Sequence, residues 1–429
     1  MKPNELLVKL NDGSLDEELG SLYGRRDSQL DDARARFCHL VETYEEAFPG
    51  TEATLVTAAG RTEMAGNHTD HQHGRVLAAS VSMDMIACAG RNGTSEIRIL
   101  QEGYPQLVLD ISDLDIREDE VGRFPALVRG VAKGITDRGY LLGGFNAVVD
   151  SQVLAGSGLS SSAAYEVLIG NILNALYCSG EVPPVALAQI GQFAENVYFG
   201  KPSGLMDQMA CAIGGVISID FNDPAHPVVE QIDFEMEDSG HVLCIIDSGA
   251  DHADLTDDYT AITHDMGAVA QYFDVEKLRD VEPARFWSEL SGLREATNDR
   301  AVLRAIHFFE DDARVPELAE SLTRGDFKRF LRLVKDSGTS SARHLQNIYS
   351  DSTPQDQAVG LTIALAEHLL GSAGAVRVHG GGFAGTVQAY VPEDEAADFK
   401  RGIEAVLGPD MCHILQVRPV GGAVIGRGQ

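Results

Sequence analysis

The chain has 429 residues, of which 44% are hydrophobic and 23% are charged, as in an ordinary globular protein. Its formal net charge of −31 argues against nucleic acid or an anionic membrane as a partner. No apolar stretch is long enough to span a membrane, and the first residues lack the apolar segment of a signal peptide. The six cysteines show no paired spacing, so we expect a reducing, cytoplasmic compartment.

Residues 1–50 are rich in charge and show helical spacing, which predicts an N-terminal helical extension rather than part of a core. The segments that follow are mixed. Strands are predicted over 55–58, 76–88, 96–100, 145–149, 214–221 and 242–247, and helices over 163–177 and 185–198. Helices dominate from 259 to 370, and two final strand pairs are predicted over 375–391 and 413–425.

Strands and helices that do not alternate regularly favour an α+β fold over a doubly wound sheet. The polar, proline-containing segment 222–227 is the best candidate for a domain junction. We therefore expect an extension over 1–50, a first domain over 51–225 and a second domain over 226–429.

Residues 156–162 read Gly-Ser-Gly-Leu-Ser-Ser-Ser and open an apolar helical segment. Small residues let the backbone approach a ligand, and the N-terminus of the following helix presents free N–H groups to anions. The hydroxyls add donors for phosphate oxygens and ligands for a hard cation. The alternative is a serine-rich cap on a buried helix.

The segment 60–74 reads GRTEMAGNHTDHQHG and has little periodicity. Asn67, His68 and Asp70 supply the amide, imidazole and carboxylate groups that grip sugar hydroxyls. Two alternatives stay open. One is a purely structural loop. The other is a metal site in which His71 and His73 join His68 and Asp70, although their spacing fits no common zinc pattern.

Two further segments carry candidate chemistry. Glu195 and Asp207 flank a Gly/Pro turn, and each by itself is typical of a helix surface or an N-terminal cap. Gly380, Gly382 and Gly385 match G-x-G-x-x-G, but a strand-like segment follows them instead of a helix. They therefore predict a glycine-rich turn that approaches a ligand, not a dinucleotide site.

Together these four segments resemble the GHMP kinases, and among them the galactokinases. Residues 60–71 are similar to the signature G-R-V-N-L-I-G-E-H-T-D-Y, and 156–164 to the phosphate loop G-x-G-L-S-S-S-A-A. Residues 195–208 resemble the segment with the magnesium-binding Glu and the catalytic Asp, and 378–385 the closing loop M-T-G-G-G-F-G-G. The resemblance runs from about Leu55 to Ile425 and implies a two-domain GHMP kinase fold with the active site in the interdomain cleft.

The resemblance also implies roles for individual residues. Asp207 would take or orient the proton of the sugar's anomeric hydroxyl, and Arg61 would keep Asp207 ionised and stabilise the transferring phosphoryl group. Ser162 and Glu195 would ligate Mg²⁺. The remaining implied contacts are with the ATP phosphates (Gly156, Ser157, Gly158, Leu159, Ser160, Ser161 and Ser162), with the sugar (Asn67, His68, Asp70, Gly204 and Tyr259), and through the closing turn (Gly380, Gly381 and Gly382).

The implied activity is transfer of the ATP γ-phosphoryl group to galactose, giving galactose 1-phosphate, with no protein partner indicated. Asn67 replaces the signature's Glu, which faces the C6 end of the sugar as the resemblance implies. A neutral Asn would not repel a carboxylate there, so galacturonate or another C6-altered sugar is an alternative substrate, with His71 or Arg75 as its basic partner. A non-catalytic sugar- and ATP-sensing regulator is a further alternative, although the complete phosphate loop favours an enzyme.

Overall fold

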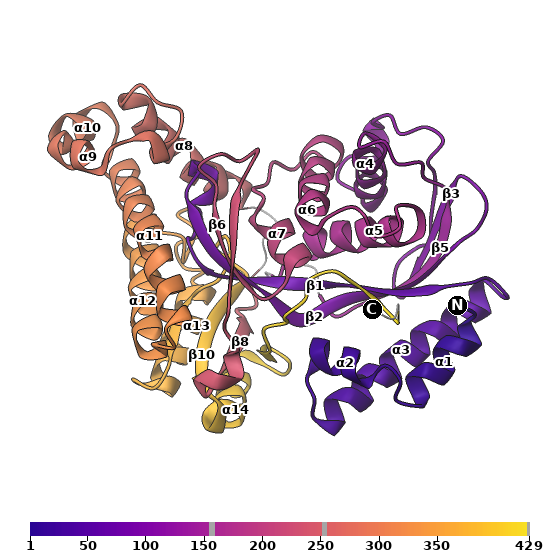
Figure 1. Cartoon of the computed structure of the whole chain (residues 1–429). Coiled ribbons are helices and arrows are strands. Elements are labelled where there is room, and N and C mark those ends of the chain that lie inside the picture. The colour runs from indigo at the N-terminus through magenta and orange to yellow at the C-terminus, as the bar shows by residue number, and fades with distance from the viewer. Residues whose placement is uncertain (154–158, 251–254, 427–429) are drawn as a thin grey trace.

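The computed structural model describes residues 1–153, 159–250 and 255–426, and within them the chain is organised around two β-sheets (Figure 1). The larger sheet has eight strands: β1 (Thr54–Ala65), β2 (Arg75–Arg91), β3 (Glu96–Gln101), β4 (Leu107–Asp110), β5 (Phe145–Ser151), β6 (Val216–Asp220), β7 (Val228–Ile232) and β12 (Ala423–Ile425). The smaller sheet has four: β8 (His241–Asp247), β9 (Ala375–Val378), β10 (Thr386–Pro392) and β11 (Cys412–Leu415). Strands and helices are mixed without regular alternation, as the α+β prediction states.

The long strand β2 organises the larger sheet, whose main order is β12-β1-β2-β5-β3-β4. Its first residues pair with β6 and its last with β5, while β1 pairs along most of its length. All these pairs are antiparallel, and only β3 and β5 are parallel within this described sheet. The sheet is therefore held together by β2, which is long enough to pair with both β5 and β6 along one of its edges.

Four helices cover one face of the larger sheet (Figure 1): α4 (Phe124–Thr136), α5 (Ser161–Tyr177), α6 (Pro184–Phe193) and α7 (Met206–Ile213). The segment of α5 is apolar on all sides because α4, α6, α7 and the sheet surround it. This burial fixes the helix whose first turn faces the candidate active site.

Three N-terminal helices cover the opposite face: α1 (Pro3–Asn11), α2 (Asp16–Tyr23) and α3 (Asp27–Ala47). They are helical as predicted, but the expectation that they lie outside a core is wrong. Leu6, Leu10 and Phe37 are fully buried in a cluster that includes Leu55 of β1 and Ile425 of β12. The many charged residues of this segment lie on the outer faces of the helices. The overall composition of the segment is therefore polar and does not reveal the apolar stripe on the inner faces.

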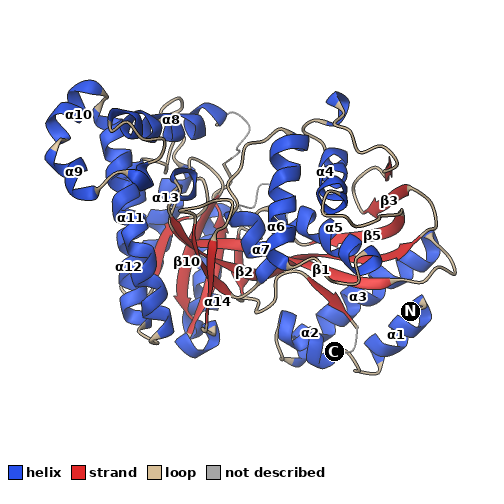
Figure 2. Ribbon diagram, turned by 45° about the horizontal axis from the view of Figure 1, so that its top comes forward, coloured by secondary structure: helices blue, strands red, loops and turns tan. Residues whose placement is uncertain are grey.

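In the smaller sheet (Figure 2), the strands β8, β9 and β10 have buried side chains on both faces. Along β8, Leu243 and Ile245 belong to one core cluster, and Cys244 and Ile246 to another, as the period of two in a strand requires. The remaining helices are α8 (Thr256–Tyr272), α9 (Pro283–Ser288), α10 (Leu290–Ala296), α11 (Asp299–Thr323), α12 (Phe327–Ser340), α13 (Ala358–Leu370) and α14 (Ala396–Leu407). Helix α12 packs on β9, and α13 and α14 contribute to the second cluster.

Two sequence expectations differ from the structure. Of the two strand pairs predicted at the end of the chain, the first forms as β9 and β10, but β11 and β12 do not pair with each other, because β11 joins β8 in the smaller sheet and β12 joins β1 in the larger one. The segment 222–227 connects β6 to β7, which are paired strands of a single sheet. The domain bounds themselves stay a prediction.

Among the described helices, none combines the length and apolarity that crossing a bilayer requires.

Asp84 of β2 joins segments from the whole chain. Its buried carboxylate accepts hydrogen bonds from Arg418 (2.8 Å) and Tyr23 (2.6 Å), and also from Arg36 and Thr57. Burial alone raises the pKa of Asp84, but the charges of Arg36 and Arg418 outweigh this and lower it. The carboxylate therefore stabilises the fold at neutral pH, and this contribution is lost only as the pH falls through the lowered pKa.

We expect Arg418→Met to lower the free energy of unfolding by about 3 kcal/mol, because it removes one partner of a buried charge. The matched control is Arg98→Met, which breaks the exposed Arg98–Glu96 pair and should cost less than about 1 kcal/mol. Urea unfolding at neutral pH measures both values. Equal effects of the two substitutions would contradict the importance of the Asp84 cluster.

Candidate active site

The ion pair between Arg61 and Asp207 lies at the centre of the candidate site. Arg61 is on β1, and Asp207 is in the first turn of α7. The guanidinium donates from Nε to Oδ1 at 2.7 Å and from Nη2 to Oδ2 at 2.8 Å, a bidentate geometry that fixes the carboxylate. The Asp207 side chain is 32% exposed, so a substrate hydroxyl can reach it. The two residues predicted to act in catalysis are thus in direct contact.

The environment of Asp207 keeps it ionised. Burial alone raises the pKa of this carboxyl, but the charge of Arg61 and the hydrogen bonds from Arg61 and Ser160 outweigh burial and hold the pKa below its ordinary value. At neutral pH the group is therefore a carboxylate, which can accept a proton or a hydrogen bond but cannot donate one.

Helix α5 begins at Ser161, directly beside this ion pair. Ser160 has a left-handed backbone (φ 59°), and its hydroxyl donates to Asp207. The first helical N–H bond is donated by Ala164 to Ser160, so the N–H groups of residues 161–163 precede the helical pattern and suit an anion. Leu159 is fully buried and anchors this end of the loop. Gly156, Ser157 and Gly158 lie outside the described residues.

The two predicted magnesium ligands also meet. Ser162 Oγ donates to Oε1 of Glu195 at 2.9 Å, and Glu195 lies in a π-helical turn (Ala194–Phe199) just after α6. Its other oxygen accepts from Gln208 Nε2 at 2.9 Å, so the carboxylate has a fixed orientation. A hydroxyl and a carboxylate are the hard oxygen donors that Mg²⁺ prefers, so these residues fit a magnesium ion.

Asp70 lies in the loop between β1 and β2 and meets Gly204. A Cβ on Gly204 would lie 2.0 Å from Asp70 Oδ2, so only glycine permits this approach. The backbone N–H of His71 donates a hydrogen bond to Asp70 Oδ1 at 3.0 Å. Asp70 and Gly204, both predicted to contact the sugar, are thus neighbours in the structure.

Three other residues assigned to the sugar hold the closing turn in this structure. The carbonyl of Gly380 accepts from Asn67, that of Gly381 from His68 Nε2, and that of Gly382 from Tyr259, at 2.6, 2.9 and 3.0 Å. Burial, followed by the charge of His71, lowers the pKa of His68 to about 3, so its ring is neutral. Each carbonyl of the three-glycine turn thus has its own side-chain donor.

The position of Asn67 corrects the expectation that it faces the sugar. The residue is 0% exposed, and its amide is engaged on both sides, by Glu63 and Gly380 as acceptors and by Asn347 as a donor at 2.7 Å. Arg75, one of the basic groups named for a sugar carboxylate, is paired with Asp312 (2.8 Å) and Asp220 (3.0 Å). Asn67 and Arg75 are therefore already engaged, and His71, whose side chain is 39% exposed, is the basic group of the galacturonate alternative that remains.

Two residues of the site, Lys201 and Glu63, are not among those predicted from the sequence. Lys201 Nζ lies 3.0 Å from Oε1 of Glu195, the oxygen that also accepts from Ser162. Glu63 lies two residues after Arg61, is buried, and forms an ion pair with Arg377 at 2.7 Å. A sequence signal existed for Glu63, because the signature has Asn at its position.

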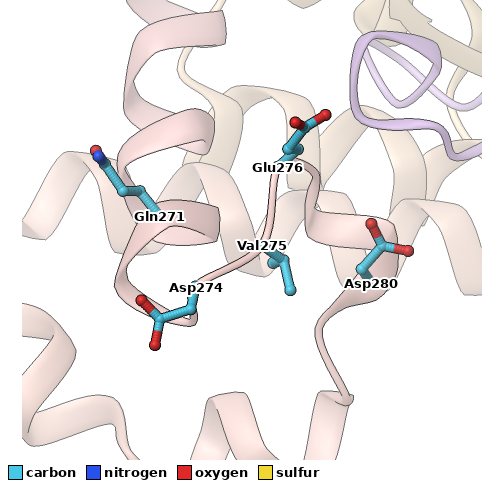
Figure 3. A pocket seen from close by; sticks show the side chains of 5 residues that line it. All are labelled: Gln271, Asp274, Val275, Glu276 and Asp280. Atoms are coloured by element: carbon cyan, nitrogen blue, oxygen red, sulfur yellow. The ribbon is translucent and has the colours of Figure 1, made fainter.

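Other candidate sites do not compete with this one. Within the described part of the chain, no group of three or more His, Cys, Asp or Glu side chains could hold a metal ion, so the histidines near Asp70 form no such cluster. A surface hollow of about 490 Å³ lies at the end of α8 (Figure 3), and its lining is Gln271, Asp274, Val275, Glu276 and Asp280. Its three carboxylates point apart in Figure 3, and none of the predicted site residues lines it.

Known proteins with the same fold share this architecture. The galactokinase of Lactococcus lactis, solved with galactose, is 23% identical, with 89% of this chain and 98% of that chain covered and a TM-score of 0.75. The mevalonate kinase of Methanococcus jannaschii is 14% identical over 86% of this chain and 99% of that chain, with a TM-score of 0.61. The phosphomevalonate kinase of Streptococcus pneumoniae is 12% identical over 84% and 99%, with a TM-score of 0.58.

Two family models match the segments that carry the site. The model of the GHMP kinases N-terminal domain matches residues 126–215, which contain the serine run, Glu195 and Asp207. The galactokinase galactose-binding signature matches residues 42–91, which contain Arg61 and Asp70. The chain therefore carries a GHMP kinases N-terminal domain, preceded by the galactose-binding signature of the galactokinases.

Proposed function

We propose that the protein is a galactokinase-like sugar 1-kinase, which transfers the γ-phosphoryl group of ATP to the anomeric hydroxyl of galactose. The observation that carries this proposal is the bidentate Arg61–Asp207 pair beside the first turn of α5. It places an ionised carboxylate, a guanidinium and an anion-binding helix terminus at one point. The match to the galactose-binding signature supports the choice of sugar.

Asp207 would accept the proton of the anomeric hydroxyl as the oxygen attacks the γ-phosphorus. Because the pKa of Asp207 is lowered, the carboxylate acts mainly by orienting the hydroxyl and taking its proton late in the reaction. Arg61 would stabilise the charge on the transferring phosphoryl group, since it is fixed beside the carboxylate and is always cationic. In-line transfer then depends mainly on positioning.

The nucleotide would lie along the first turn of α5, where the N–H groups of residues 161–163 suit its phosphates. Ser162 and Glu195 would hold Mg²⁺, which neutralises phosphate charge when bound. Lys201 contacts the same Glu195 oxygen and adds a partly exposed positive charge beside it. Asp70, next to Gly204, would bind sugar hydroxyls.

The first test is ADP release with ATP and Mg²⁺ in the presence of galactose, galacturonate and other hexoses. We expect release with galactose and little with galacturonate, because Asn67 is buried and Arg75 is already paired. A preference for galacturonate would contradict the proposed substrate. Binding of galactose and ATP without turnover would support a sensor and contradict the proposed enzyme.

We expect Asp207→Asn to lower kcat by about 10²- to 10⁴-fold, because an amide cannot accept the proton. Binding of ATP, measured by calorimetry, should remain, since the fold around α5 is unchanged. The matched control is Asp326→Asn, which alters the N-terminal cap of α12, a role that Asn also fills. If both variants kept normal kcat, Asp207 would be only a helix cap.

We expect Gly204→Ala to raise the KM for galactose by about 10- to 100-fold, because the added Cβ displaces Asp70 Oδ2. The KM for ATP should change much less. Gly267→Ala is the matched control, since a Cβ at this position on α8 meets open space. Initial-rate kinetics with each substrate varied in turn measure both constants, and an unchanged KM for galactose would exclude Asp70 from the sugar site.

A further inference from the structure

Glu63 and Asn67 exchange the residue types of the galactokinase signature. The signature G-R-V-N-L-I-G-E-H-T-D has Asn two positions after its Arg and Glu directly before its His. This chain has Glu63 and Asn67 at those positions. One carboxylate and one amide are therefore retained, but each stands where the other is in the signature.

The two side chains are in direct contact. Asn67 Nδ2 donates to Glu63 Oε1 at 2.9 Å, and both side chains are buried. The same Nδ2 donates to the carbonyl of Gly380 at 2.6 Å. Because an amide nitrogen has two hydrogens, these two acceptors use its full donor capacity. The position of the Glu63 carboxylate thus decides where Asn67 points.

Arg377 of β9 fixes the carboxylate. Its Nη2 donates to Glu63 Oε1 at 2.7 Å, and the Arg377 side chain is fully buried. Among the described residues, its Nε and Nη1 have no hydrogen-bond partner, so Glu63 is the carboxylate that is hydrogen-bonded to this guanidinium, whereas Asp311 acts on it through its charge. Without Glu63 the buried guanidinium would lose its hydrogen-bonded counterion.

The pair acts on the closing turn through a short chain of contacts. Asn67 holds the carbonyl of Gly380, and Asn347, which donates to Asn67 Oδ1 at 2.7 Å, also donates to the carbonyl of Gly381 at 3.1 Å. The backbone of Asn67 is held from α11, where Asp311 accepts its N–H and His307 contacts its carbonyl, at 3.0 and 2.9 Å. The loop that carries Asp70 is therefore fixed, and these hydrogen bonds fix the position of the Gly380–Gly382 turn relative to it.

We propose that Glu63 is a positioning residue of the sugar site, and that Glu63 and Asn67 form an exchanged pair that sets the Gly380–Gly382 turn against the Asp70 loop. The inference rests on the proposed function, because it concerns the same sugar site. Relative to the signature, the exchanged order still provides a carboxylate as the counterion of Arg377. This carboxylate is on Glu63, and no longer on the residue directly before His68.

The test is a double-mutant cycle that restores the order of the signature. Glu63→Asn leaves Arg377 without its counterion, and Asn67→Glu places two carboxylates in contact and removes the donor to Gly380. We expect each single change to raise the KM for galactose at least about 10-fold. The double variant E63N/N67E again has one carboxylate and one amide in the pair, and should return to within about 3-fold of the wild type.

Two comparisons separate positioning from general damage. Glu120→Asn is the matched control, because it removes the partner of Arg129, another buried arginine, which Glu120 binds at 2.7 and 2.8 Å. It should lower Tm but leave the KM for galactose unchanged. In the Glu63 and Asn67 variants, kcat and the KM for ATP should change much less than the KM for galactose.

If the single variants are too unstable for kinetics, Glu63→Gln provides the measurement. It keeps the size of the side chain and an oxygen for Arg377, and we expect weaker galactose binding by calorimetry with ATP binding retained. Additive effects in the double variant, or an unchanged KM for galactose in both single variants, would overturn the inference. A wild type that neither binds nor phosphorylates galactose would instead overturn the proposed function.

Discussion

Three consecutive buried polar residues on β1 hold the two sides of the active site together. Arg61 pairs with Asp207 of α7, Thr62 accepts from Gln388 of β10, and Glu63 pairs with Arg377 of β9. Burying any of these three side chains without its partner would cost free energy. This part of β1 is therefore stable only when the larger and the smaller sheet are both folded. The groups suited to ATP and those suited to the sugar are therefore parts of one polar interface.

Much of this site could be predicted from the sequence because its chemistry is local. The serine run opens a helix, Asp207 begins another, and each lies within a segment whose motif indicates its role. The contacts Arg61–Asp207 and Ser162–Glu195 bring such motifs together as the resemblance implies. Secondary structure followed from periodicity in the same way, since strands such as β8 and helices such as α5 differ clearly in pattern.

The remaining features depend on partners that are distant in the sequence. Asn67 and Asp70 are neighbours in one polar loop, and only the contact of Asn67 with Gly380, 313 residues away, shows that Asn67 is buried. The last two strands have strand-like sequences, but nothing local indicates that they join different sheets. The apolar stripe of the N-terminal helices is likewise recognisable only beside the sheet that it covers.

The contact between Asp84 and Arg418 has a consequence for the order of events during synthesis. The two residues are 334 positions apart, and β12, which pairs with β1, comes later still. While the ribosome makes the rest of the chain, the free edge of β1 has no strand beside it, and such an edge is prone to pair with other chains. Arg36 and Tyr23 precede Asp84 in the sequence, so Arg36 can neutralise its carboxylate and Tyr23 can donate a hydrogen bond to it before Arg418 has been synthesised.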